Sequence, residues 1–306
     1  MKRQKLSVAH FAPLLIILGA SCWGIIGLFT KRLSSCGCSA AQIAFLRCAV
    51  SALLMLLYLV VFDRKQLKIA LRDIWMFLGT GILSLVMFSV LYFTTIETTG
   101  LSVAAVLLYT APCFVMIMSA IFFKEKITSR KLAALIVAFI GCTCTTGLMS
   151  ALFSGSLSGI GCKGILTGLG SGFGYALYTI FGNVALKKYS SVTVTFYTLA
   201  FAAIGLAPFC LRGEFLALVS QPEVIWSGLG ICVFSTIAPY LLYTLGLNYT
   251  QPGRASVLAF TETVVATLVG VLVFNETLTS YGVAGNVLIF ASLLFLSMKK
   301  ESPQDA

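Results

Sequence analysis

Hydrophobic residues in this chain gather into ten long runs that polar residues interrupt only briefly. A helix needs about 20 mainly apolar residues to cross the hydrocarbon core of a bilayer. Continuous apolar stretches such as 53–62 and 132–140 exclude the alternating pattern of a membrane β-barrel. The pattern therefore predicts an all-α membrane protein with ten spans, at about residues 11–30, 41–62, 74–95, 101–123, 130–149, 164–186, 191–211, 224–246, 253–274 and 279–298.

Composition and charge support the same fold class. Hydrophobic residues make up 59% of the chain and charged residues 10%, whereas a soluble protein carries about a quarter charged residues. The net charge of +11 does not indicate nucleic-acid binding, because the basic residues lie in short gaps between spans. With a cytoplasmic N-terminus, 16 lysines and arginines fall on the cytoplasmic side and four on the other. This bias predicts that both termini are cytoplasmic and that the protein resides in the cytoplasmic membrane.

The two halves of the chain match each other at an offset of 151 residues. Ten positions are identical between residues 92–129 and 243–280, including the polar pair Glu125 and Glu276. Five spans per half is an odd number, so the second half must enter the membrane in the inverted sense. The predicted organisation is a cytoplasmic tail at 1–10, a first five-helix repeat at 11–149, an outer connecting loop at 150–163, an inverted second repeat at 164–298 and a cytoplasmic tail at 299–306.

Inverted repeats are typical of carriers, because two similar bundles that exchange conformations expose a midplane site to each side in turn. The chain has a single histidine, His10, and no nucleotide-binding motif or C-x-x-C pair. We therefore expect neither an enzyme nor a metal or cofactor site. The energy source would be the solute gradient or a coupled ion, with the proton as the candidate.

Four segments resemble the drug/metabolite transporter superfamily, and in particular its ten-helix members with two EamA-type domains. They are CWGIIGLFTKRL (22–33), AFLRCAV (44–50), YTAPCFVMIMSAIFFKEKIT (109–128) and FTETVVATLVGVLVFNETLT (260–279). The resemblance covers essentially the whole chain in two consecutive copies. It implies a solute carrier with a central cavity, often a bacterial exporter of amino acids or other metabolites.

One position departs from the pattern of the resembled family. Pro112 in the first copy aligns with Thr263 in the second, where the family usually repeats the proline. Proline inside a membrane helix favours a kink or a local opening. The departure therefore predicts a mid-membrane helix break in the first copy only.

Two charged residues inside spans are the sharpest candidates for solute contact. Glu262 lies near mid-bilayer, where an acid is costly unless it faces a cavity, a partner or a proton. It either contacts a solute amine or a coupling proton, or it is a structural acid bonded to serine or threonine hydroxyls. Arg47 either fixes a solute carboxylate through its planar fork of donors or extends to the outer interface.

Aromatic and hydroxyl side chains inside the spans form the rest of the candidate cavity. Tyr175 and Tyr178 share one helix face, and Tyr240 and Tyr243 share another. Such faces would bind a flat or cationic solute by stacking and cation–π contact, although plain helix packing is the alternative. The other candidates for the cavity are Trp23, Tyr92, Tyr109, Thr110 and Thr261.

Glu125 and Glu276 end equivalent spans on opposite faces of the membrane, and each precedes a threonine, Thr128 or Thr279. We interpret these segments as corners with helix N-caps. The glutamates would alternatively act as gates by bonding the opposite half when one side closes.

The leading hypothesis is a secondary transporter that exports a small polar metabolite, such as an amino acid, by alternating access. A carrier for hydrophobic cations, as in multidrug efflux, is the first alternative, and a non-transporting membrane protein is the second. The solute's identity, the direction of movement and the oligomeric state are not readable from the sequence.

Overall fold

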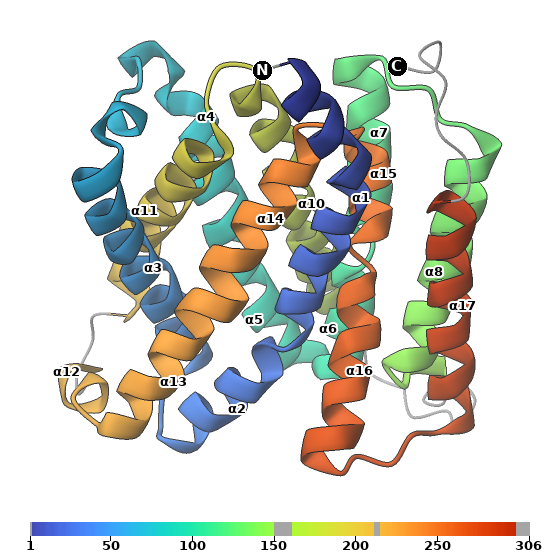
Figure 1. Ribbon diagram of the computed structural model, residues 1–306. Coiled ribbons are helices and arrows are strands. Elements are labelled where there is room, and N and C mark those ends of the chain that lie inside the picture. The colour runs from blue at the N-terminus through green and yellow to red at the C-terminus, as the bar shows by residue number, and fades with distance from the viewer. Residues whose placement is uncertain (1, 150–160, 211–214, 298–306) are drawn as a thin grey trace.

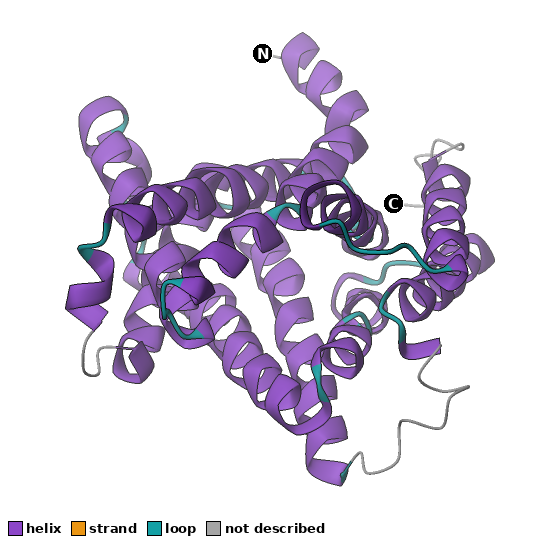
Figure 2. Ribbon diagram, turned by 90° about the horizontal axis from the view of Figure 1, so that it is seen from below, coloured by secondary structure: helices purple, strands orange, loops and turns teal. Residues whose placement is uncertain are grey.

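The computed structural model describes residues 2–149, 161–210 and 215–297, and every regular element in these ranges is a helix (Figure 2). No strand occurs in this part of the chain. The predicted connecting loop at 150–163 and the predicted tail at 299–306 lie largely or wholly outside the described residues.

Eight α-helices of the first half are described in full, from α1 to α8 (Figure 1). Two 3₁₀ turns, Arg64–Leu67 and Leu71–Asp73, lie between α3 and α4, and a π-helix, Gly79–Val86, joins α4 to α5. The α-helices are α1 (Lys2–Gly24), α2 (Ile26–Ser35), α3 (Ala40–Phe62), α4 (Ile74–Leu78), α5 (Met87–Thr99), α6 (Leu101–Leu108), α7 (Ala111–Phe123) and α8 (Ser129–Thr145).

The second half repeats this order, except that the single helix α10 stands where the first half has α1 and α2. A π-helix, Val233–Ile237, joins α13 to α14 at positions that the 151-residue offset relates to the first π-helix. The α-helices are α10 (Cys162–Leu186), α11 (Ser191–Cys210), α12 (Phe215–Val219), α13 (Pro222–Cys232), α14 (Ala238–Leu247), α15 (Pro252–Leu258), α16 (Thr261–Phe274) and α17 (Ser280–Ser297).

Seven helical stretches among the described residues are long and apolar enough to cross a membrane. Each coincides with a predicted span. The other three predicted spans fall on α8, α10 and α17, which are helical but shorter or less apolar. Large apolar side chains such as Phe62, Trp226 and Leu272 are exposed on the outside of the helices, as a lipid environment requires. The protein is thus a multi-pass membrane protein, and the count of ten spans stays a prediction.

The connections between spans define two faces of the molecule. The N-terminal face, where α1 begins and towards which α17 ends, carries residues 63–73, 124–128, 187–190 and 248–251 (Figure 1). The distal face carries residues 36–39, Gly100 and 275–279.

The spans pack into two bundles that each contain helices of both halves. In the first bundle, α10 packs against α5, α6 and α7, and in the second bundle, α1 packs against α14, α15 and α16. Two further pairs stand beside these bundles, α3 with α11 and α8 with α17, and the latter pair lies at one edge of the molecule (Figure 1). Because each bundle draws on both halves, the halves cannot separate as independent domains.

Helix breaks occur in both copies, so the prediction of a break in the first copy only is wrong. The chain leaves the helix at Tyr109–Thr110 between α6 and α7, and at Ala259–Phe260 between α15 and α16. The feature that the two breaks share is a threonine rather than a proline. Thr110 and Thr261 each bond the carbonyl three residues earlier through the hydroxyl, at 2.6 and 2.9 Å. A hydroxyl that takes a backbone carbonyl in this way competes with the helical ladder.

Glycines on α10 let the first bundle pack closely. A side-chain carbon added at Gly164 would lie 2.2 Å from Thr99 Cγ2, and one added at Gly168 would lie 2.3 Å from Leu107 Cδ1. Membrane helices associate through such small residues because lipid supplies no hydrophobic force between them.

We expect the exchange Gly172→Ala to destabilise the protein by roughly 1–3 kcal/mol through overpacking. The new methyl group would lie 2.6 Å from Thr110 Oγ1 and 2.9 Å from the Leu107 carbonyl oxygen. Gly27→Ala is the matched control, because a side-chain carbon there meets nothing within 4 Å. Thermal unfolding in detergent measures the effect, and equal melting temperatures for the two variants would contradict this packing.

Candidate functional site

A cavity of about 510 Å³ lies between the two bundles and reaches the distal face. Its rim includes the exposed residues Ser34, Ala40 and Leu101, and its inner end lies at the mid-span helix breaks. This central cavity is lined by residues of both halves, Trp23, Ile26, Thr30, Ser34, Ala40, Ile43, Ala44, Arg47, Phe88, Ser89, Tyr92, Phe93, Ile96, Leu101, Leu108, Tyr109, Tyr175, Tyr240 and Glu262.

Two side chains of opposite charge line the central cavity. Arg47 comes from α3 and is 9% exposed, so the structure places it in the cavity rather than at the lipid interface. Glu262 lies in the first turn of α16, directly after the helix break, where the helix N-terminus favours a negative charge. No ion pair within 4 Å joins the two side chains in the described part of the chain. Both charges therefore face the cavity without neutralising each other at contact distance.

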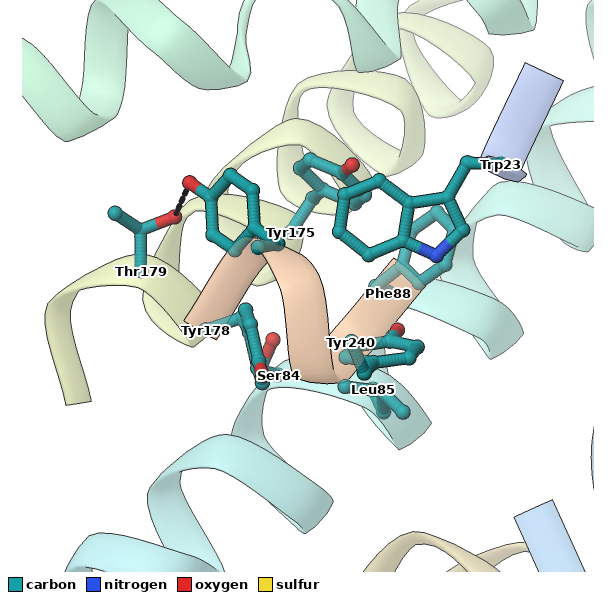
Figure 3. A pocket seen from close by; sticks show the side chains of 9 residues that line it. Trp23, Ser84, Leu85, Phe88, Tyr175, Tyr178, Thr179 and Tyr240 are labelled. Carbon is teal, nitrogen blue, oxygen red and sulfur yellow. Dashed lines mark hydrogen bonds between the residues drawn. The ribbon is translucent and has the colours of Figure 1, made fainter. Parts of the chain in front are cut away.

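Aromatic rings form the inner end of the cavity. Trp23 packs edge-on against Tyr240 with ring centroids 5.2 Å apart, and Tyr175 packs against Phe88 at 5.4 Å. Figure 3 shows these side chains around a small pocket that shares Trp23, Tyr175 and Tyr240 with the central cavity. The rings line the same cavity as the two charges and give it an apolar surface.

Hydrogen bonds close the molecule behind these rings, towards the N-terminal face. The hydroxyls of Tyr178 and Thr244 lie 2.5 Å apart. Those of Thr179 and Tyr243 lie 2.8 Å apart, and a dashed line marks this bond at Thr179 in Figure 3. Each pair links α10 of the first bundle to α14 of the second. We call them the tyrosine–threonine pairs.

The structure brings most of the predicted site residues together. Seven of the eleven line the central cavity: Trp23, Arg47, Tyr92, Tyr109, Tyr175, Tyr240 and Glu262. Tyr178 and Tyr243 lie behind it in the tyrosine–threonine pairs. Thr110 and Thr261 belong to the helix breaks and do not line the cavity.

Sequence reasoning missed a buried polar cluster at the N-terminal face. Glu125 pairs with Lys131 at 3.1 Å, their side chains are 6% and 3% exposed, and the Glu125 carboxylate accepts the Gly253 N–H at 3.2 Å. The Lys131 ammonium also donates to the Gln251 side-chain oxygen. We call these four residues the Glu125 cluster. The available signal in the sequence was the spacing of six residues between Glu125 and Lys131 across a short turn.

The predicted corner devices are present in both copies. Thr128 caps α8 by accepting the Lys131 N–H at 3.3 Å, and Thr279 caps α17 by accepting the Gly282 N–H at 3.1 Å. Pro112 lies in the first turn of α7, directly after the first helix break.

Comparisons with known proteins identify the family and its relatives. The sequence profile of the EamA-like transporter family matches residues 10–147 and 162–298. An uncharacterized transporter of Archaeoglobus fulgidus is 30% identical over 91% of this chain and 93% of its own length. The uncharacterized transporter YxxF of Bacillus subtilis is 24% identical over 95% of this chain and 90% of its own length. A crystal structure of a protein 14% identical in sequence has the same fold, with a TM-score of 0.76 over 94% of this chain and 98% of that one.

Proposed function

The chain belongs to the EamA-like transporter family, within the drug/metabolite transporter superfamily, and we propose that it exports a small zwitterionic metabolite such as an amino acid. The observation that carries the proposal is the pair of opposite charges, Arg47 and Glu262, in one aromatic cavity. A guanidinium offers two parallel donors to a carboxylate, and a carboxylate accepts bonds from an ammonium. A volume of about 510 Å³ is within the range of small-molecule sites.

A carrier for hydrophobic cations is the second candidate. The rings of Trp23, Tyr175 and Tyr240 around Glu262 favour it, because aromatic faces attract cations. Arg47 lines the same cavity and would repel a solute that carries only positive charge. The zwitterion satisfies both charges, so we prefer it.

For the topology we propose ten spans in the cytoplasmic membrane, with both termini on the cytoplasmic side. The support is the excess of lysine and arginine on the N-terminal face and the helical character of all ten predicted spans. In this orientation the central cavity opens to the outside. The tyrosine–threonine pairs and the Glu125 cluster close the cytoplasmic side.

We propose that the two bundles rock against each other around the cavity. This motion would open the cavity to each face of the membrane in turn and so move the solute across. Glu262 is also the proposed binding group for a coupling proton, since proton and ammonium would compete for one carboxylate. A proton-coupled carrier in proteoliposomes moves its solute in response to an imposed pH gradient. If the solute does not respond to the pH gradient, the energy source is the concentration gradient of the solute itself.

Metabolite profiling of whole cells tests the proposed function. Cells expressing the wild-type chain, Glu262→Gln, Glu97→Gln or an empty vector are compared for solutes inside and outside. Glu97 is the control because it is an exposed acid of α5 that does not line the cavity. We expect one class of amino acid or related zwitterion to accumulate outside with wild type and Glu97→Gln only. Accumulation inside the cells would reverse the direction, and no change in either compartment would overturn the proposal.

A further inference from the structure

The Glu125 cluster clasps the two bundles together at the N-terminal face. Glu125 follows α7 of the first bundle, and Gly253 lies in α15 of the second. The bond from the Gly253 N–H to the Glu125 carboxylate therefore crosses between bundles. Lys131 of α8, which pairs with Glu125, also bonds Gln251 at the start of α15. Helices α7 and α15 pack directly against each other beside these bonds.

The corner that presents Glu125 recurs at the distal face around Glu276. The residue before each glutamate has a left-handed backbone, with φ of 57° at Lys124 and 53° at Asn275. Each glutamate N–H also bonds the carbonyl six residues earlier, at 3.2 and 3.0 Å. The backbone thus places a glutamate at the same point of each repeat.

The two glutamate side chains nevertheless have different surroundings. Glu276 is exposed, and its carboxylate lies over Gly270, where an added side-chain carbon would be 2.4 Å from Oε2. Ser102, in the first turn of α6, is the residue that corresponds to Gly253 at the 151-residue offset. The first N–H groups of a helix have no partner within it. Helices α16 and α6, the counterparts of α7 and α15, make no comparable packing contact.

We propose that Glu276 is the gate of the distal face. When that face closes, the Glu276 carboxylate accepts the Ser102 N–H and links the two bundles. The Glu125 carboxylate links them in the same way at the N-terminal face in this structure. The proposal rests on the alternating access described above, and it assigns to Glu276 the positioning of the bundles rather than contact with the solute.

The two gates are not equally strong. The offset relates Lys131 to Gly282 and Gln251 to Gly100, so the distal gate lacks the ammonium and its amide partner. It also relates the tyrosine–threonine pairs to Gly27, Leu28, Tyr92 and Phe93, which cannot form the same bonds. The empty carrier therefore favours the conformation that is open on the distal face. A solute that contacts both bundles would add the attractive contacts that the distal gate lacks, and so would help to close the distal face.

A thiol placed in the cavity tests the gates without any solute. The reporter is Thr30→Cys, on the distal side of the central cavity, and a charged thiol reagent is added to the purified protein in nanodiscs. Peptide mass spectrometry reads the labelling rate at position 30 separately from the native cysteines. Glu125→Gln should lower the ratio of distal-open to distal-closed carrier roughly tenfold, the effect of one hydrogen bond to a charged group, so labelling slows because the distal face is closed for part of the time. Adding Glu276→Gln should restore the wild-type rate, whereas adding Glu97→Gln should not.

Slow labelling that persists in the Glu125→Gln, Glu276→Gln double variant would overturn the gate, and so would an unchanged rate in Glu125→Gln. If Glu125→Gln fails to fold, Glu276→Gln alone serves, because it should bind the solute found by profiling with unchanged affinity while its transport rate falls roughly tenfold. A wild-type transport rate in this variant would overturn the gate. The labelling assay needs no solute, so its outcome is independent of whether the solute class proposed above is right.

Discussion

Exchange of Arg47 for glutamine is expected to lower transport of a zwitterionic solute by about 30-fold or more, because truncating one partner of a buried charge pair costs about 2–5 kcal/mol. Glu262→Gln is expected to have a similar effect, since each residue binds a different end of the solute. The two variants should differ in what they still carry. Arg47→Gln keeps the carboxylate of Glu262 and should retain the decarboxylated amine, whereas Glu262→Gln should retain the carboxylic acid that lacks the amine.

Competition in proteoliposomes measures this difference, with the amino acid that profiling identifies and its two analogues as competitors. Glu97→Gln, at an exposed position that does not line the cavity, should behave as wild type towards all three compounds. If both cavity variants lose all three compounds equally, or lose none, the two charges do not recognise the two ends of the solute. Retention of hydrophobic cations by Arg47→Gln alone would favour the second candidate function.

The fold was largely predictable because its strongest signals are local or repeated. Apolar runs of span length mark the helices, and the recurrence of Glu125 at Glu276 reveals the two copies. Most of the cavity was predictable for a related reason. A charge such as Glu262, or a tyrosine such as Tyr240, is costly in lipid and therefore points to a protein interior.

The rest could not be predicted because it depends on contacts between distant segments. Sequence alone does not show that Lys131 turns inward to Glu125 and Gln251, or that Tyr178 and Tyr243 lie behind the cavity instead of in it. The second helix break was missed because proline was taken as its cause. The structure shows that the threonine hydroxyl, present in both copies, accompanies the break in each.

The two copies differ in the charged residues of the cavity, and the proposed solute recognition depends on this difference. Arg47 corresponds to Thr198, and Glu262 corresponds to Ala111, so each cavity charge occurs in one half only. Thr198 is buried, bonds Thr80 at 2.6 Å and does not line the central cavity. A symmetric ancestor of the cavity would carry like charges related by the pseudo-two-fold axis. The observed arrangement instead offers one positive and one negative group, which is what a zwitterion requires.

Replacement of Lys131 by methionine is expected to be among the most destabilising single changes in the protein. It would leave the Glu125 carboxylate buried with the Gly253 N–H and without its cation. Breaking a buried ion pair from one side typically costs about 3–5 kcal/mol, whereas replacing both partners by groups of similar volume is often neutral. The double variant Glu125→Gln, Lys131→Met should therefore recover most of the decrease in melting temperature caused by Lys131→Met.

The control is Lys68→Met. Lys68 is exposed on the same face, so this exchange should leave the melting temperature unchanged. Thermal unfolding in detergent decides the point: if Lys131→Met unfolds at the wild-type temperature, the Glu125–Lys131 ion pair contributes no net stability.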